Sequence, residues 1–139
     1  MAGKFFVDTN ILVYAYDRLA GMKHQRARDL TERLWKANAG ALSTQVLQEL
    51  CVSLQREVAN PASLEKIREI VRTYVSWHIV VNTPESIMRA LEIEERYKIS
   101  FRDALIVQAA EKSGASILYS EDLATGQIFG SIQVVNPLL

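Results

Sequence analysis

The stretch of sequence that decides the fold lies at residues 4–12 and reads KFFVDTNIL. Three apolar residues, Phe5 to Val7, predict a short strand covered on both faces, as in a parallel sheet. Asp8 then stands at the carboxyl end of that strand, the edge at which open α/β sheets bind ligands. Two interpretations of Asp8 are open at this point: a ligand-binding carboxylate, or the N-cap of the helix that follows.

The composition of the 139 residues indicates one globular domain, residues 1–139, with 49% hydrophobic and 23% charged residues. Sixteen basic and sixteen acidic residues give a formal net charge of zero, so nucleic-acid binding would need a local basic patch. A single cysteine, Cys51, excludes an internal disulfide and fits a reducing compartment. With no signal peptide and no membrane-length apolar run expected, we predict a cytoplasmic protein.

Beyond residue 12 the chain alternates between helical and strand patterns. Asn60-Pro61 and Thr83-Pro84 have the form of helix starts, and Gly40 and Gly114 are placed as residues just past helix ends. Strands are expected at 41–42, 77–81, 117–119 and 132–135, and helices at 11–16, 24–39, 44–54, from 61 onward, 84–97 and 101–113. This alternation predicts an α/β fold with a mainly parallel sheet and helices on both faces.

Four acidic residues fall where this topology gathers polar chemistry: Asp8, Glu49, Asp103 and Asp122. Each has a structural alternative, namely a helix cap, a solvated helix residue, a capping box with Ser100, and a turn residue. Four carboxylates at one edge would repel each other strongly unless a cation lies between them. Oxygen ligands with few histidines favour Mg²⁺ or Mn²⁺ over zinc.

Other chemistries have weaker support in the sequence. The phosphate-binding patterns GxxxxGK[ST] and GxGxxG are missing from the 139 residues. Cys51 lies on an apolar helix face and is expected to be a core thiol. A phosphatase of the haloacid dehalogenase type would need a second Asp two residues after Asp8, where this chain has Asn10.

With these residues placed, the chain resembles PIN-domain ribonucleases, and most of all the VapC toxins of type II toxin–antitoxin systems. The resemblance rests on four short motifs in order and on the tail, at residues 6–12, 43–50, 100–106, 118–123 and 134–137. It implies a three-layer α/β/α fold around a mainly parallel sheet of four or five short strands. It also implies an endoribonuclease that hydrolyses RNA phosphodiester bonds with Mg²⁺ or Mn²⁺.

The resemblance also assigns roles to residues. Asp8, Glu49, Asp103 and Asp122 match the acidic quartet, with Asp8 and Asp103 as the best direct metal ligands. Glu121 is a neighbouring alternative to Asp122, which is preferred because it stands two residues after Ser120. Glu49 or Asp122 would assist proton transfer, with one or two metal ions. The polar residues that would support metal and substrate are Asn10, Ser120 and Thr44.

Partners follow from the same resemblance and from charge. A cationic segment is a candidate track for the RNA backbone, and it contains Arg18, Lys23, Arg26 and Arg28. The resemblance implies a homodimer and a VapB-type antitoxin, which would lay a C-terminal segment across this chain. Tyr14, Tyr16 and Trp35 are candidates to line the groove for that segment, and the alternative is that these aromatic residues belong to the core. Two alternatives are a PIN-domain nuclease of RNA processing or decay outside toxin–antitoxin systems, and an inert PIN-fold module that only binds RNA or protein.

Overall fold

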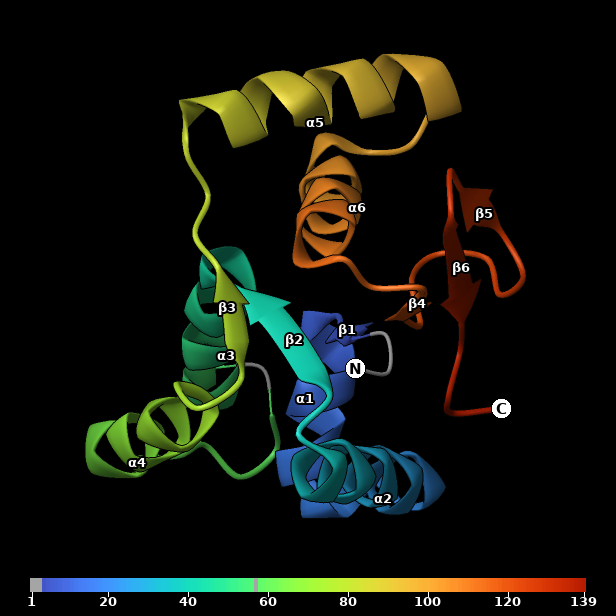
Figure 1. The fold of residues 1–139 in the computed structure, drawn as a ribbon. Helices are drawn as coiled ribbons and strands as arrows, with labels where there is room; N and C mark the ends of the chain where they lie inside the picture. The colour runs from blue at the N-terminus through green and yellow to red at the C-terminus, as the bar shows by residue number, and fades with distance from the viewer. Residues whose placement is uncertain (1–3, 57) are drawn as a thin grey trace.

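A computed structural model, which describes residues 4–56 and 58–139, has a six-stranded sheet in the order β3-β2-β1-β4-β6-β5. Every neighbouring pair is parallel except β5 and β6, which are antiparallel. The strands are β1 (Phe5–Val7), β2 (Gly40–Ser43), β3 (His78–Val80), β4 (Ile117–Tyr119), β5 (Ile128–Phe129) and β6 (Ile132–Val135). Figure 1 shows this sheet running through the molecule between two groups of helices.

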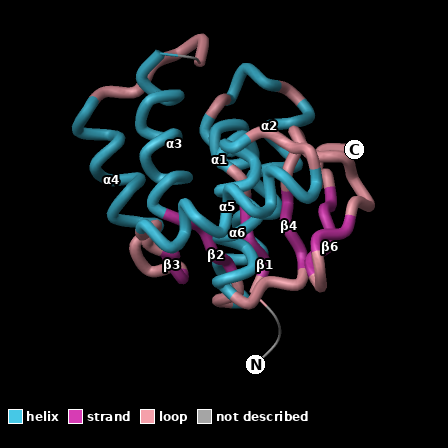
Figure 2. The backbone as a smooth tube through the Cα atoms, turned by 90° about the horizontal axis from the view of Figure 1, so that it is seen from above, coloured by secondary structure: helices cyan, strands magenta, loops and turns pink. Residues whose placement is uncertain are grey.

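Helices cover both faces of the sheet, as predicted. They are α1 (Thr9–Tyr16), α2 (Met22–Ala37), α3 (Thr44–Arg56), α4 (Leu64–Tyr74), α5 (Pro84–Tyr97) and α6 (Phe101–Ser113), with a 3-10 turn, η1, at Arg18–Ala20. On one face α6 packs on β1 to β3, and α5 packs on α6. On the other face α2 and α3 contact β2, and α1 joins α2 to α3 (Figure 2). The three-layer α/β/α architecture is therefore confirmed.

The buried layer explains why these short strands form. Phe6, Val7, Ala41, Leu42 and Leu118 have no exposed surface, as expected of strands covered on both faces. Helix α6 is nearly as deeply buried as the strands, which its almost continuous apolar sequence predicted. None of the helices in the described ranges is long and apolar enough to cross a membrane.

Several predicted boundaries are confirmed. Helix α5 starts at Thr83-Pro84 with a capping box, and α6 runs from the Ser100 cap to Gly114, which adopts a left-handed φ of 80°. Helix α3 starts after β2, with the Ser43 side chain accepting a hydrogen bond from Val46 N.

Two predicted boundaries were wrong. The helix expected from Pro61 begins at Leu64, because Ser63 is the N-cap and Ala62 N is still bonded to Leu54 O at the end of α3. Helix α2 ends at Ala37 with Asn38 as its C-cap, and not at Ala39 with Gly40 just past the end. Gly40 instead opens β2, where a Cβ atom would lie 2.4 Å from the Trp77 ring. The glycine is needed for close packing and not for turning the chain.

The sheet also has one strand more than expected. Strand β5, only two residues long, pairs antiparallel with β6 through Ile128 and Phe129. Its two residues carry too short a pattern to be recognised as a strand in sequence. Cys51, expected in the core, is only partly buried and packs against it.

Candidate active site

The register of the sheet brings Asp8 and Ser120 together. Val7 pairs with Tyr119 across β1 and β4, so the next residue of each strand lies at the same carboxyl edge. Ser120 Oγ donates to Asp8 Oδ2 at 2.8 Å, and it accepts from the backbone N–H groups of Asp122 and Leu123. Both side chains are fully buried. Asp8 is therefore held rigidly at the sheet edge.

The N-cap interpretation of Asp8 is confirmed, while the ligand-binding interpretation stays a prediction. Asp8 is the N-cap of α1, and its Oδ1 accepts from Thr9 N at 2.7 Å. The same carboxylate also contacts Arg102, with 2.8 Å between Asp8 Oδ1 and Arg102 Nη2. Capping uses only part of the hydrogen-bonding capacity of a carboxylate, which has about four lone-pair sites.

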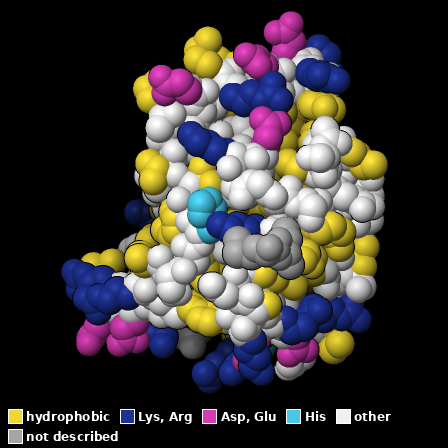
Figure 3. Space-filling model, viewed as in Figure 1, with side chains coloured by type: hydrophobic (Ala, Val, Ile, Leu, Met, Phe, Trp, Pro, Cys, Tyr) yellow, Lys and Arg dark blue, Asp and Glu magenta, His cyan; other side chains and the backbone are white. Residues whose placement is uncertain are grey.

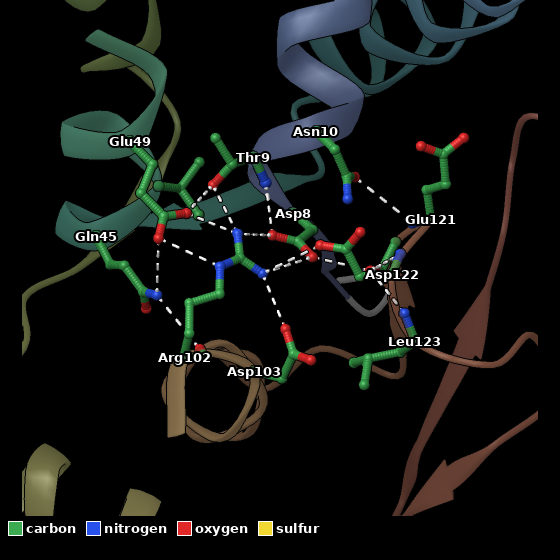
Figure 4. Close-up of polar contacts among 12 residues, drawn as sticks. Asp8, Thr9, Asn10, Gln45, Glu49, Arg102, Asp103, Glu121, Asp122 and Leu123 are labelled. Carbon is green, nitrogen blue, oxygen red and sulfur yellow. Dashed lines mark hydrogen bonds and ion pairs between the residues drawn. The ribbon is translucent and has the colours of Figure 1, made fainter. Parts of the chain in front are cut away.

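The other three acids arrive from different elements. Glu49 projects from the second turn of α3, Asp103 lies in the first turn of α6, and Asp122 follows β4. Figure 4 shows the four carboxylates around one point at the sheet edge. We call this group the acidic cluster: Asp8, Glu49, Asp103 and Asp122.

The point at which the acidic cluster converges is taken by a guanidinium group. Arg102 Nη2 lies 2.6 Å from Glu49 Oε1, and Arg102 Nη1 lies 3.1 Å from Asp103 Oδ1 and 3.6 Å from Asp122 Oδ2. With its contact to Asp8, Arg102 forms ion pairs with all four acids. This residue was missed in the sequence, although a cation in the first turn of a helix is unfavourable without partners.

Two further residues that sequence reasoning missed orient Glu49. Thr9 Oγ1 donates to Glu49 Oε1 at 2.7 Å, and Gln45 Nε2 donates to Glu49 Oε2 and to the Arg102 carbonyl, each at 3.3 Å. Gln45 lies one helical turn before Glu49, and this spacing was the available signal. Burial alone would raise the pKa of Glu49, but the bonds from Arg102 and Thr9 outweigh it and leave the pKa below its usual value.

Asp122 has the loosest position of the four. Its side chain is half exposed, and its contact with Arg102 is the longest in the cluster. Desolvation, followed by the negative charge of Asp8, raises the pKa of Asp122 above its usual value. The environments of Glu49 and Asp122 therefore push their pKa values in opposite directions.

Glu121, the neighbouring alternative, takes part in a separate group. Its carboxylate accepts from the Tyr14 hydroxyl at 2.8 Å and pairs with Lys23 Nζ at 2.7 Å. Figure 4 shows it pointing away from Arg102. This arrangement favours Asp122 over Glu121 as the fourth acid of the cluster.

The expected polar residues divide between the cluster and other roles. Asn10 Oδ1 accepts from Glu121 N at 3.5 Å, while its buried Nδ2 has no partner among the residues that the structure describes. Thr44 does not join the cluster, because its hydroxyl accepts from Asn82 N. Asp103 N donates to the Ser100 cap, but the Asp103 carboxylate contacts Arg102.

A cleft of about 600 Å³ opens beside the acidic cluster and gives solvent access to it. Its lining includes Asn10, Tyr14, Glu49, Arg102 and Asp122. A second cavity of about 550 Å³ lies between α1, α2 and α4, and aromatic and basic side chains line it together: Tyr16, Trp35, Tyr74, Arg18, Arg28, Lys36 and Lys66.

The predicted RNA-contacting cations are dispersed over these surfaces. Lys23 forms an ion pair with Glu121, which precedes Asp122 in the sequence. Arg18 and Arg28 line the second cavity. Arg26 donates to the Leu138 carbonyl and holds the C-terminal segment against α2. Figure 3 shows Lys and Arg side chains gathered over α2 and α4 on the face in view.

The chemistry of the cluster fits a hard divalent cation, since every donor is a carboxylate oxygen and the acids outnumber the arginine four to one. Within residues 4–56 and 58–139, however, no three acidic, His or Cys side chains are spaced as a ready-made metal site. The Arg102 guanidinium lies between the carboxylates. Metal binding at this place therefore requires the guanidinium to move.

Comparisons with known proteins agree with this architecture. The profile of the PIN domain matches residues 5–126. Among solved structures, VapC20 of Mycobacterium tuberculosis, described as a sarcin-ricin loop cleaving toxin, aligns with a TM-score of 0.66 and 23% identity over 86% of this chain and 90% of that chain. A toxin–antitoxin complex from Klebsiella pneumoniae aligns with a TM-score of 0.66 and 20% identity, over 97% of this chain and 98% of that chain. A DNA-bound VapBC complex from Salmonella typhimurium aligns with a TM-score of 0.63 and 16% identity, over 95% of this chain and 96% of that chain. No curated protein matches the chain.

Proposed function

The chain belongs to the PIN-domain family, and on this premise we propose that it is a metal-dependent endoribonuclease, the toxin of a VapBC-type toxin–antitoxin pair. The observation that carries the proposal is the convergence of Asp8, Glu49, Asp103 and Asp122 from four separate segments onto one point. Four acids that share one arginine leave an excess of negative charge, which a divalent cation would offset.

Mg²⁺ or Mn²⁺ would be held by these carboxylates, with Asp8 and Asp103 as the best direct ligands. When bound, such an ion activates water and offsets charge on a phosphodiester undergoing in-line attack. The buried Asp8 provides the rigid part of the site, because Ser120 and Thr9 N fix both of its oxygens. Fixed donors need no reorganisation during the reaction.

A proton must leave the attacking water, and Asp122 is the acid best placed to accept it. Both oxygens of Glu49 are already bonded to Thr9, Gln45 or Arg102. Asp122 is half exposed and lines the cleft, and its carboxylate makes only the long contact with Arg102 among the residues that the structure describes. Asn10 also lines this cleft, and its buried Nδ2 has no partner among the described residues.

The RNA backbone needs cations beyond the acidic cluster. We propose that RNA runs from the cleft toward the second cavity, where Arg18 and Arg28 lie beside Trp35 and Tyr16. Basic and aromatic side chains together suit single-stranded RNA, because bases stack on rings while cations hold the phosphates. Lys23, next to Glu121, lies on the cluster side of this path.

The decisive experiment compares wild type with Asp8→Asn on structured RNA in Mg²⁺ or Mn²⁺. We expect cleavage that EDTA abolishes, and a loss of at least about a hundredfold in Asp8→Asn, since about 1.4 kcal/mol of transition-state stabilisation corresponds to each factor of ten. Asp29→Asn, the same change at an exposed acid of α2 that is bonded to Gln25, is the matched control. Equal activity in Asp8→Asn and wild type would contradict a role of Asp8 in catalysis.

The toxin role has its own test. Expression of the wild type should arrest growth, Asp8→Asn should relieve the arrest, and co-expression of the small protein encoded beside the gene should also relieve it. RNA cleavage without growth arrest, or no adjacent antitoxin frame, would favour a PIN-domain nuclease of RNA processing or decay. Binding of RNA with no cleavage would favour the inert module.

We also propose that the toxin is a cytoplasmic homodimer. Exposed apolar side chains on α5 support self-association: Ile87, Met88 and Leu91 are 47%, 63% and 45% exposed. Light scattering during gel filtration checks the mass, and replacement of Met88 and Leu91 by Ser should shift a dimer to a monomer. A wild-type monomer contradicts this part of the proposal.

A further inference from the structure

We infer that Arg102 is an internal counter-ion that competes with the divalent cation for the acidic cluster, so that metal binding and release of the Arg102 side chain are one coupled step. The inference rests on the proposed function, because it presupposes a metal site at these carboxylates. It adds that the chain itself tunes the affinity of that site.

The first argument is geometric. The guanidinium donates from all three of its nitrogens: Nε to Glu49, Nη1 to Asp103, and Nη2 to Asp8 and Glu49. These contacts take up carboxylate oxygens that a metal would need. A cation at the centre of the cluster and the Arg102 guanidinium therefore cannot share that place.

The second argument is charge. Arg102 supplies one positive charge to four acids, and it is the one cation that forms ion pairs with any of the four among the described residues. The cluster remains deficient in positive charge, which leaves it attractive to a second cation. A divalent ion offers twice the charge of a guanidinium in a smaller volume, so exchange is favourable once the metal concentration is high enough.

The third argument is that the side chain can leave without moving the backbone. Arg102 is one-third exposed and lines the 600 Å³ cleft, so solvent-filled space lies beside it. Its carbonyl is held by Gln45 Nε2, and the Ser100 cap fixes the start of α6. Rotation about the side-chain bonds of Arg102 is thus enough to uncover the four carboxylates.

The position into which Arg102 would move is also informative. RNA that reaches the acidic cluster must cross the cleft, and a released guanidinium there meets its phosphates with bidentate geometry. The same residue would neutralise the acids before metal binding and attract the polyanion afterwards.

The test measures metal binding in the absence of RNA. Metal-free wild type, Arg102→Ala and Arg102→Met are titrated with Mn²⁺ and followed by electron paramagnetic resonance of the free ion. We expect Kd to fall by about tenfold or more in both variants, because the apparent affinity is reduced by the fraction of sites that are open. Lys23→Met is the matched control: it removes one positive charge beside Glu121 without opening the cluster.

A second measurement uses the wild-type protein, so it does not depend on whether a variant folds. In isotope-labelled wild type, the Arg102 Nε–H signal should be protected from solvent exchange without metal and lose that protection as Mg²⁺ is added. The signals of Arg89, which lies on the α5–α6 surface, should not change.

The outcomes separate the two proposals. Wild-type binding with an unchanged Kd in the Arg102 variants, or an equal fall of Kd in Lys23→Met, overturns the inference and leaves the nuclease proposal standing. Retained protection of Arg102 at saturating Mg²⁺ overturns it as well. No Mn²⁺ binding by wild type or by either Arg102 variant overturns both.

Discussion

Arg102 on α6 and Arg89 on α5 each bind more than one carboxylate, but in different surroundings. Arg89 forms a bidentate pair with Glu111 of α6 and a third bond to Glu92, and all three side chains are 44–68% exposed. Arg102 is 33% exposed, and one of its four acids, Asp8, has no exposed surface. The Arg89 group joins two helices at the surface, where water solvates each charge.

The difference shows how surroundings change the consequence of one kind of contact. A surface ion pair contributes little to stability because water competes with it for both partners. A buried carboxylate has no such alternative and depends on the partners that the fold provides. The Arg102 group has four acids for one arginine, whereas the Arg89 group has two. The larger excess of acids and the burial of Asp8 are what distinguish the candidate site from the surface contact.

The largest expected effect on stability comes from Arg102→Met in metal-free protein. Removing one partner of a buried ion pair costs about 3–5 kcal/mol, and the partial exposure of Arg102 lowers our expectation to about 2 kcal/mol. Urea unfolding in EDTA at neutral pH measures this loss. Added Mg²⁺ should restore more stability to the variant than to wild type. If Arg102→Met loses as little stability as Arg89→Met, burial does not distinguish the two groups.

A smaller effect is expected from Arg89→Met, the same substitution at the surface group. Exposed pairs contribute about 0.2–1 kcal/mol, so we expect a loss within that range. Because salt screens exposed charges, the loss should shrink further at high ionic strength. Parallel urea unfolding at low and high salt checks both statements. A salt-independent loss would mean that the contact between α5 and α6 matters through packing instead.

The smallest effect, with the opposite sign, is expected from Asp122→Asn. Since the pKa of folded Asp122 is raised, ionisation costs the folded state stability as pH rises through that pKa. In metal-free protein at neutral pH we therefore expect the variant to gain about 0.5 kcal/mol, a low value because Asp122 is half exposed. The gain should vanish below the unfolded pKa of about 3.9. Unfolding of both proteins across this pH range measures it, and a gain that grows at acid pH contradicts the argument.

Where the sequence predicted structure well, local chemistry and tertiary packing agreed. Ser100 and Gly114 bracket α6 because a hydroxyl acceptor and a left-handed glycine satisfy the two helix ends locally. Where the prediction was wrong, a distant contact decided the outcome. Gly40 looked like a helix end, but the Trp77 ring, 37 residues away in sequence, requires it in β2.

The same contrast between local patterns and distant contacts applies to the candidate site. Asp8 and Ser120 were predictable because parallel register alone aligns the ends of β1 and β4. Arg102 was not predicted, since its role depends on Glu49 and Asp8 arriving from elements 53 and 94 residues away. The acids could be listed from the sequence, but the cation they share appeared only once the three-dimensional arrangement was known.

The short strands at the two margins of the sheet have a consequence for recognition. Strand β3 has three residues and β5 has two, so neither margin offers more than a few free backbone N–H and C=O groups to another chain. Adding a strand to this sheet would gain few hydrogen bonds for a partner, whether a second copy or a different protein. Recognition of this molecule therefore falls to its helical surfaces and its cleft, and the exposed sheet margins are poor templates for aggregation.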